Sequence, residues 1–283
     1  MNFVLSLFPG IGLLDMAFEE EGFTVVRGPD VLWGGDIIRF HPPAGKFDGV
    51  IGGPPCQAFS SLAHLVRANG HEPRFGNLIP EFERCVAEAS PAWFVMENVP
   101  AAPEPSVPGY GAKGFLLDNS AILGDGGFGL EQRRVRRITF GLRGRDDVPS
   151  LMRWIDLAVF FLPDASRAKP ITASHDSLEN LDSLGKEKKN RVRRSAQLAS
   201  LRETPVAIGG SGKVKRTALA GCHPSTRENV RYKFGDALRL QGLPGDFLKD
   251  APFTAEGKLK AVANGVPIPM GRAIARAVKE ALQ

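Results

Sequence analysis

The sequence predicts an α/β protein with a doubly wound, mostly parallel sheet and a second, small and loop-rich domain. From the N-terminus to about residue 100, short apolar runs typical of strands alternate with stretches of helical periodicity. After Pro163 the apolar period is lost, and Ser, Lys, Arg and Gly dominate to about residue 226. We therefore expect a first domain over residues 1–163, a small domain over 164–254, and a C-terminal segment, 255–283, that returns to the first domain.

Five strands are expected, each from a short run of aliphatic, aromatic or β-branched residues. They cover Phe3–Phe8, Thr24–Arg27, Phe47–Ile51, Ala92–Met96 and Ile138–Leu142. The third run meets Gly52-Gly53-Pro54-Pro55, which stops a strand abruptly. The residues that follow such a stop lie at the carboxyl edge of the sheet, where ligands gather in open α/β folds.

Helices are expected where apolar residues recur at helical spacing. They cover Leu13–Glu21, Ile79–Ala89, Leu151–Phe161 and Met270–Leu282. In the first of them, Leu14, Ala17 and Phe18 share one face. The Pro- and Gly-rich stretch Ala101–Gly114 is expected to be a loop.

Composition argues against a membrane protein and against a disulfide-stabilised secreted one. Hydrophobic residues make up 43% of the 283 residues, yet no apolar run approaches the ~20 residues of a membrane span. The N-terminus shows no secretory signal. The three cysteines, Cys56, Cys85 and Cys222, are odd in number and widely spaced, which indicates reduced thiols in a cytoplasmic protein. Cys222-His223 has no partner at ligand spacing, so no metal site is expected.

The positive charge of the chain is concentrated in its second half. The net charge of +5 is by itself weak support for a polyanionic partner. Its distribution is more informative, because two basic runs lie in the loop-rich segment: Lys186, Lys188, Lys189, Arg191, Arg193 and Arg194, then Lys213, Lys215 and Arg216. Such runs are commonly solvated surface, but they also suit contacts with a phosphate backbone.

A positioned thiol follows the third expected strand. Cys56 stands directly after Pro54 and Pro55, which fix their own backbone and force extended conformation on their neighbours. The thiol is therefore held rigidly at the end of a strand, as a nucleophile requires. The alternative is a small buried cysteine without chemistry.

Glycines after the first strand and an aspartate after the second are candidates for nucleoside binding. Phe8-Pro9-Gly10-Ile11-Gly12 joins a strand to a helix, and its glycines allow a flat ligand to approach the backbone closely. A tight strand-to-helix turn is the alternative. In Gly35-Asp36-Ile37 the aspartate can accept a bond from an adenine amino group while Ile37 packs on the ring, or it can simply cap a helix.

Charged residues border the fourth and fifth expected strands. Glu97 follows the buried run that ends at Met96, and a carboxyl group beside a reacting base can share or donate a proton. Arg134 and Arg136 are two residues apart, so alternation along a strand predicts that both guanidinium groups face one pocket. An exposed basic edge strand is the alternative.

Taken in order, these pieces resemble the cytosine-5 methyltransferase family. The matching blocks are FPGIG, GDI, GGPPCQAFS, ENVP, QRRVRR, RLQGLP and ANGVPIP, which span nearly the whole chain. PPCQ combined with ENV and QxRxR is highly specific. The resemblance implies a Rossmann-like sheet that binds S-adenosylmethionine, a small target-recognition domain, and DNA in the cleft between them. It also implies a DNA (cytosine-5-)-methyltransferase of the bacterial or phage restriction-modification kind.

The resemblance assigns roles to individual residues. Cys56 would attack C6 of cytosine, Glu97 would engage N3 and the exocyclic amine, and Arg136 would bond O2. Arg134 would help to order the catalytic loop. The positions that look like cofactor contacts are Phe8, Gly10, Gly12, Asp30, Asp36, Ile37, Pro55, Leu78, Asn264 and Val266. Pro29 falls where the family has its ribose-binding acid, with Asp30 one residue on.

Double-stranded DNA is the partner that the resemblance implies. The segment from Ser60 to Asn77 resembles the mobile loop that closes over a flipped base, and the DNA contacts expected there are Ser60, Arg67 and Arg74, in addition to the basic runs. A monomer is expected, with a cognate endonuclease encoded separately and no membrane association. Two alternatives stay open: a tRNA cytosine-5 methyltransferase, and a DNA-binding homologue without catalysis.

Overall fold

The computed structural model describes residues 2–56, 59, 76–124, 129, 130, 132, 134–158 and 233–283. These residues form two compact units. One comprises Met1–Leu117, Val135–Ile155 and Met270–Gln283, and the other comprises Asp118–Arg134 and Asp156–Pro269. This division differs from the boundaries expected at residues 163 and 254, because the segment after Leu117 and the helix before Pro269 both belong to the second unit.

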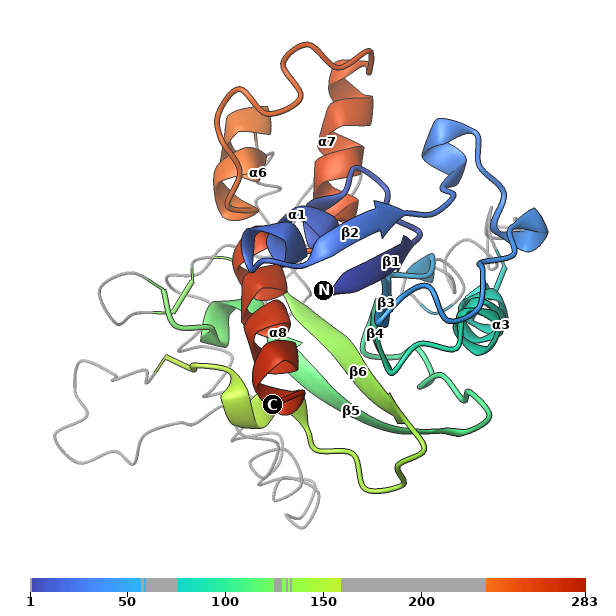
Figure 1. Cartoon of the computed structure of the whole chain (residues 1–283). Helices are drawn as coiled ribbons and strands as arrows, with labels where there is room; N and C mark the ends of the chain where they lie inside the picture. The colour runs from blue at the N-terminus through green and yellow to red at the C-terminus, as the bar shows by residue number, and fades with distance from the viewer. Residues whose placement is uncertain are drawn as a thin grey trace, which may run out of the picture. The chain divides into compact units, whose positions relative to one another are not determined.

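A six-stranded sheet forms the centre of the first unit, in the order β2-β1-β3-β4-β6-β5 (Figure 1). Its strands are β1 (Phe3–Leu7), β2 (Thr24–Arg27), β3 (Gly49–Gly52), β4 (Trp93–Asn98), β5 (Tyr110–Asp118) and β6 (Val135–Arg143). The first four strands pair in parallel, and β6 pairs antiparallel with β4. The mixed sheet confirms the predicted α/β class.

The order of the strands creates a switch point between β1 and β3. The chain passes from β1 to β2 on one side, and then resumes with β3 on the other side of β1. Open α/β sheets bind their ligands beyond the carboxyl ends of the strands at such a point. Two of the predicted motifs, Phe8–Gly12 after β1 and Gly53–Cys56 after β3, begin at this edge.

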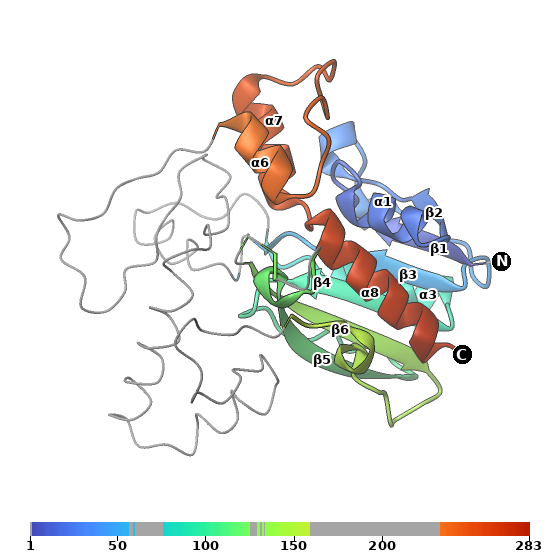
Figure 2. The ribbon, with the colours of Figure 1, turned by 90° about the vertical axis from the view of Figure 1, so that its left-hand side faces the viewer.

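Helices cover both faces of the sheet. The helices α1 (Leu13–Glu20) and α8 (Ile268–Ala281) lie side by side on one face, while α3 (Ile79–Ala89) covers the other (Figures 1 and 2). Neighbouring residues of β4 show how the faces alternate: Trp93 stacks on Phe18 of α1, and Phe94 meets Phe82 of α3 edge-on at 5.9 Å between ring centroids. The predicted helix Met270–Leu282 is confirmed with a shift of two residues or fewer.

Two sequence predictions about local structure are wrong. The helix expected over Leu151–Phe161 is only a 3₁₀ turn, Leu151–Trp154, after which the chain becomes extended and Leu157 pairs with Ile122. A short apolar run fits either a helix or an extended segment, and here pairing with Ile122 decides. The loop expected over Ala101–Gly114 ends early, because β5 begins at Tyr110 despite the glycines within it.

In the second unit, α6 (Phe234–Leu240) packs beside α7 (Ala255–Asn264), as Figure 1 shows. Buried Gln241, which ends α6, joins the two helices. Its side-chain amide donates to the carbonyl of Val262 at 2.7 Å and to that of Gly265 at 3.2 Å. The end of α7 is therefore fixed by hydrogen bonds from α6. Within the described residues, no helix combines the length and apolar character that a membrane span requires.

Candidate active site

Cys56 lies where the sequence predicts it, just beyond the end of β3. The strand stops at Gly52, the backbone runs through Gly53, Pro54 and Pro55 without regular structure, and a tight turn begins at Cys56. In this turn the amide of Phe59 donates to the Cys56 carbonyl at 3.0 Å. Cys56 is partly exposed. It is thus accessible at the carboxyl edge of the sheet and anchored by the strand before it.

Cys85 provides the contrast. It lies in α3 with no exposed surface, packed in the apolar cluster beneath the sheet. Burial raises the pKa of its thiol to about 11, against a smaller opposing effect of Arg84. A thiol in this state is not a nucleophile at neutral pH. Of the two cysteines that the structure describes, Cys56 alone is placed for chemistry.

Glu97 is held next to the segment that carries Cys56. Gly52 pairs with Met96 across the parallel β3–β4 ladder, so Gly53 comes beside Glu97. A β-carbon at residue 53 would lie 3.2 Å from Glu97 Oε2, so the glycine lets the carboxylate come close. Asn98, buried at the end of β4, donates its amide to the Pro54 carbonyl at 3.1 Å. These contacts fasten the cysteine-bearing segment to the strand that carries the glutamate.

Arg136 pairs with Glu97. Its Nε lies 2.9 Å from Glu97 Oε1, and both side chains are largely buried. The contact is an ion pair without hydrogen-bond geometry, and Nη1 of the same guanidinium donates to the Val135 carbonyl at 2.7 Å. Among the described residues, the buried Oε1 atom therefore has a charge partner but no hydrogen bond. A buried acceptor left in this state is ready for a donor from a ligand.

Arg134 belongs to the second compact unit and Arg136 to the first, so the expectation that both guanidinium groups face one pocket stays a prediction. Arg134 precedes β6, which begins at Val135, so strand periodicity does not apply to it. Its guanidinium donates to the carbonyls of Ala263 at 2.9 Å and Gly265 at 3.1 Å. Arg134 and Gln241 thus fix the same turn from two directions. Next to that turn are two predicted cofactor positions, Asn264, which is exposed, and Val266, which is buried.

The turn after β1 is strained and its central glycine is fully engaged. Phe8, a bulky residue, has φ +58°, and Gly10 and Gly12 also adopt positive φ. Asp30 accepts the Gly10 amide at 2.9 Å and the Leu32 amide at 2.7 Å, while the indole of Trp33 donates to the Gly10 carbonyl at 2.7 Å. Each Asp30 oxygen is thus already bonded to the backbone, which makes Asp30 a residue that shapes this turn.

A buried carboxylate, that of Asp15, binds residues of β1 and β2 next to this turn. Asp15 in α1 is fully buried and accepts hydrogen bonds from the Ser6 hydroxyl at 2.5 Å and from Arg27 Nε at 3.0 Å. Burial raises the pKa of Asp15, although Ser6 and Arg27 act in the opposite direction. Gly12 has φ +81°, a conformation that favours glycine, and a β-carbon there would come within 2.8 Å of the Arg27 guanidinium, which would have to shift.

Three of the predicted cofactor positions converge on one apolar cluster. Ile37 belongs to the cluster between the sheet and α3, and Phe8 and Leu78 pack against it. Asp36 is exposed and caps the 3₁₀ turn Ile37–Arg39, accepting the Ile38 amide at 3.0 Å. This is the geometry of the capping alternative. The other oxygen, Oδ2, lies 3.5 Å from Arg39 Nε in an exposed ion pair. A carboxylate has about four acceptor sites, so Asp36 can accept a further hydrogen bond beside these two contacts.

Comparison with known proteins decides the family. Residues 35–105 match the sequence profile of the C-5 cytosine-specific DNA methylases. The Type II methyltransferase M.FnuDI of Fusobacterium nucleatum is 26% identical over 99% of this chain and 94% of its own length. M.HgiGI of Herpetosiphon aurantiacus is 31% identical over 35% of this chain and 90% of its own length. The chain belongs to the C-5 cytosine-specific DNA methylase family.

The fold agrees with this assignment. A solved structure of a Spodoptera frugiperda DNMT2 mutant is similar over 100% of both chains, with a TM-score of 0.56 and 16% sequence identity. The resemblance inferred from the motif order is confirmed. Within the methylase fold, the structure adds two residues that sequence reasoning missed as site components: Trp33, whose signal was an aromatic residue directly before Gly34-Gly35, and Asn98, which stands inside the ENV motif.

Several predicted site residues lie outside the described part of the chain. They are the loop positions Ser60, Arg67 and Arg74, the basic-run positions Lys186, Lys188, Lys189, Arg191, Arg193, Arg194, Lys213, Lys215 and Arg216, and the third cysteine, Cys222. The small domain expected over residues 164–254 is described only from Lys233 onward. The predictions about DNA contacts therefore stay predictions.

Proposed function

We propose that this methylase transfers a methyl group from S-adenosylmethionine to C5 of a cytosine flipped out of a specific double-stranded DNA site. The observation that carries the proposal is the pairing of an accessible Cys56 with the buried Glu97–Arg136 pair at one edge of the sheet. The Asn98–Pro54 hydrogen bond couples the two. A nucleophile and a charged pair held this way suit addition to an electron-poor ring.

Each of the three side chains has a defined part in this chemistry. The Cys56 thiolate adds to C6, so a C–S bond forms and electron density moves onto C5. Glu97 accepts from the exocyclic amine and shares a proton with N3, while the Arg136 guanidinium stabilises charge on O2. Once C5 carries the new methyl group, a base or water removes its proton, and the C–S bond breaks to free Cys56.

The residues after β1 and β2 fit a nucleoside cofactor. Within the described part of the chain, a β-carbon at Gly10 would meet no heavy atom within 4 Å, so this turn borders open space. Phe8, Ile37 and Leu78 offer apolar surface there, and Asp36 offers an exposed acceptor for a 6-amino purine. S-adenosylmethionine, when bound, supplies the methyl group from its sulfonium. Gly12, Asp30, Pro55, Asn264 and Val266 are proposed to complete this site.

DNA is the substrate that the proposal requires. In a duplex, C5 and C6 of cytosine are stacked, so the base must leave the helix to reach Cys56. The loop with Ser60, Arg67 and Arg74 is proposed to close over the flipped base. The basic runs are proposed to contact phosphates, and the small domain to read the base sequence.

Bisulfite sequencing of a plasmid co-expressed with this protein tests the proposal. We expect protected cytosines at one recurring sequence, because a restriction-modification methylase modifies a defined site. The plasmid co-expressed with the Cys56→Ala variant serves as the control and should show none. In parallel, purified protein is offered radiolabelled S-adenosylmethionine with plasmid or with tRNA. Label in tRNA alone would replace the DNA proposal with the tRNA alternative, and binding without label would support a non-catalytic homologue.

A further inference from the structure

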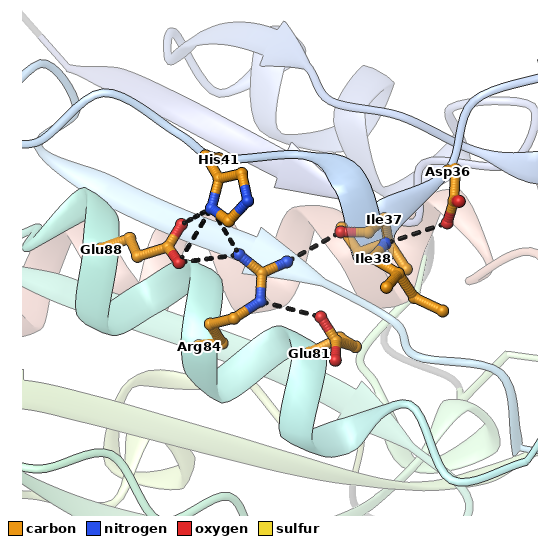
Figure 3. Close-up of polar contacts among 7 residues, drawn as sticks. All are labelled: Asp36, Ile37, Ile38, His41, Glu81, Arg84 and Glu88. Atoms are coloured by element: carbon orange, nitrogen blue, oxygen red, sulfur yellow. Dashed lines mark hydrogen bonds and ion pairs between the residues drawn. The ribbon is translucent and has the colours of Figure 1, made fainter.

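A single arginine in α3 gathers three acceptors from two elements. Arg84 Nε donates to Glu81 at 2.9 Å, Nη1 to Glu88 at 2.8 Å, and Nη2 to the carbonyl of Ile37 at 2.8 Å (Figure 3). His41 joins from the segment after Ile37, with Nδ1 lying 3.1 Å from Glu88. Figure 3 shows the guanidinium between the α3 carboxylates and the Asp36–Ile38 segment.

The two carboxylates hold the guanidinium in one orientation. All three guanidinium nitrogens are engaged, which is a use of the planar fork that a lysine could not reproduce. Although burial acts in the opposite direction, hydrogen bonds from Arg84 and His41 hold the pKa of Glu88 below its usual value. Hydrogen bonds to Glu88 and Glu81 raise the pKa of Arg84 against the effect of burial. The charged forms of Arg84 and Glu88 therefore stabilise each other.

The hydrogen bond from Arg84 to the Ile37 carbonyl connects α3 to a segment outside the helix. Between β2 and β3 the chain forms only two 3₁₀ turns, so its backbone has few regular hydrogen bonds of its own. Arg84 ties this segment to α3, which is fixed in the core through Phe82 and Cys85. The tie is made at Ile37, the residue directly after exposed Asp36. It thus sets where the Asp36 carboxylate stands.

We infer that Arg84 is a positioning residue for the subsite that recognises the 6-amino purine of the cofactor. This inference rests on the proposed function, since Asp36 is the acceptor proposed for the amino group. Arg84 acts through the Ile37 carbonyl and touches no ligand. Loss of its guanidinium allows the Asp36–Ile38 segment to move, which weakens recognition of the amino group more than the rest of the binding.

The test compares two ligands by calorimetry: S-adenosylhomocysteine, and S-inosylhomocysteine, which lacks the amino group. The wild type is expected to bind the adenine compound more tightly. In Arg84→Gln, the Kd of the adenine compound should rise about tenfold, while that of the inosine compound stays within about twofold. Activity at saturating cofactor should change little, so the effect falls on KM and not on kcat.

Arg143→Gln is the matched control. Arg143 is likewise bonded to a backbone carbonyl, donating to Ser90 at 2.8 Å, but this contact is at the C-terminal end of α3 and does not involve the Asp36–Ile38 segment. It should leave both Kd values unchanged. Arg84→Lys keeps the charge and should raise the Kd of the adenine compound by an intermediate amount. This variant provides the test if Arg84→Gln does not fold. Equal weakening of both ligands by the Arg84 variants, or no weakening, overturns the inference. A wild type that binds neither ligand overturns the proposed cofactor as well.

Discussion

Two arginine–glutamate pairs in the same compact unit differ in how many of their polar atoms are hydrogen-bonded. Around Arg84, each guanidinium nitrogen has an acceptor, and both oxygens of Glu88 have partners. Around Arg136, the nearest carboxylate oxygen, Glu97 Oε1, is buried without a hydrogen bond in the described part of the chain. An unsatisfied buried acceptor costs about 1–3 kcal/mol. A pair whose polar atoms are all hydrogen-bonded stabilises the structure, whereas a pair with an unbonded acceptor can still accept a hydrogen bond from a substrate.

The two described cysteines show the same contrast between structure and chemistry. Cys85 fills a place in the apolar cluster, where burial holds its proton. Cys56 is partly exposed at a strand end, next to the segment pinned by Asn98. Residue type alone does not separate the two; their positions relative to the strand ends do.

Exchanging the two cysteines for alanine should produce the largest difference. Cys56→Ala should lower methyl transfer by on the order of 10⁴-fold or more, since the nucleophile is lost. Cys85→Ala should keep the rate within about threefold. DNA containing 5-fluorocytosine provides a direct readout, because it should trap a covalent adduct in the wild type and in Cys85→Ala only. An adduct in Cys56→Ala would show that another residue is the nucleophile.

Neutralising Glu97, which has the unbonded oxygen of the Glu97–Arg136 pair, should have the next largest effect on methyl transfer. Glu97→Gln should lower kcat by about 10²–10³ with little change in KM for the cofactor, because the interaction is used in the transition state. Stability should also fall, because the largely buried Arg136 loses its charge partner, so kcat is compared at a temperature where both proteins are folded. Glu104→Gln breaks a more exposed pair, Arg137–Glu104 at 2.9 Å, and is the matched control with kcat unchanged. A similar loss of kcat in both variants would contradict the contrast.

The sequence predicted the elements whose pattern is local and missed those decided by contacts. Strand Thr24–Arg27 and helix Ile79–Ala89 were predicted residue for residue, because period and turn residues define them. Strand β5 was missed because Gly111 and Gly114 interrupt its pattern, and it forms as the neighbour of β6. The site followed the same rule. Motif order identified Cys56 and Glu97, whereas the partners of Arg134 depend on carbonyls near residue 264, which no spacing in the sequence reveals.

The smallest expected effect concerns stability at high pH. In the unfolded chain the Cys85 thiol loses its proton near pH 8.5–9, but in the folded protein its pKa is about 11. Between these values the unfolded state binds fewer protons, so the free energy of unfolding falls as pH rises, by on the order of 1 kcal/mol per pH unit. Urea unfolding at pH 8, 9 and 10 should show this slope in the wild type and in Cys56→Ala, and a shallower one in Cys85→Ala. Equal slopes in all three proteins would mean that Cys85 is not sealed from solvent as its burial indicates.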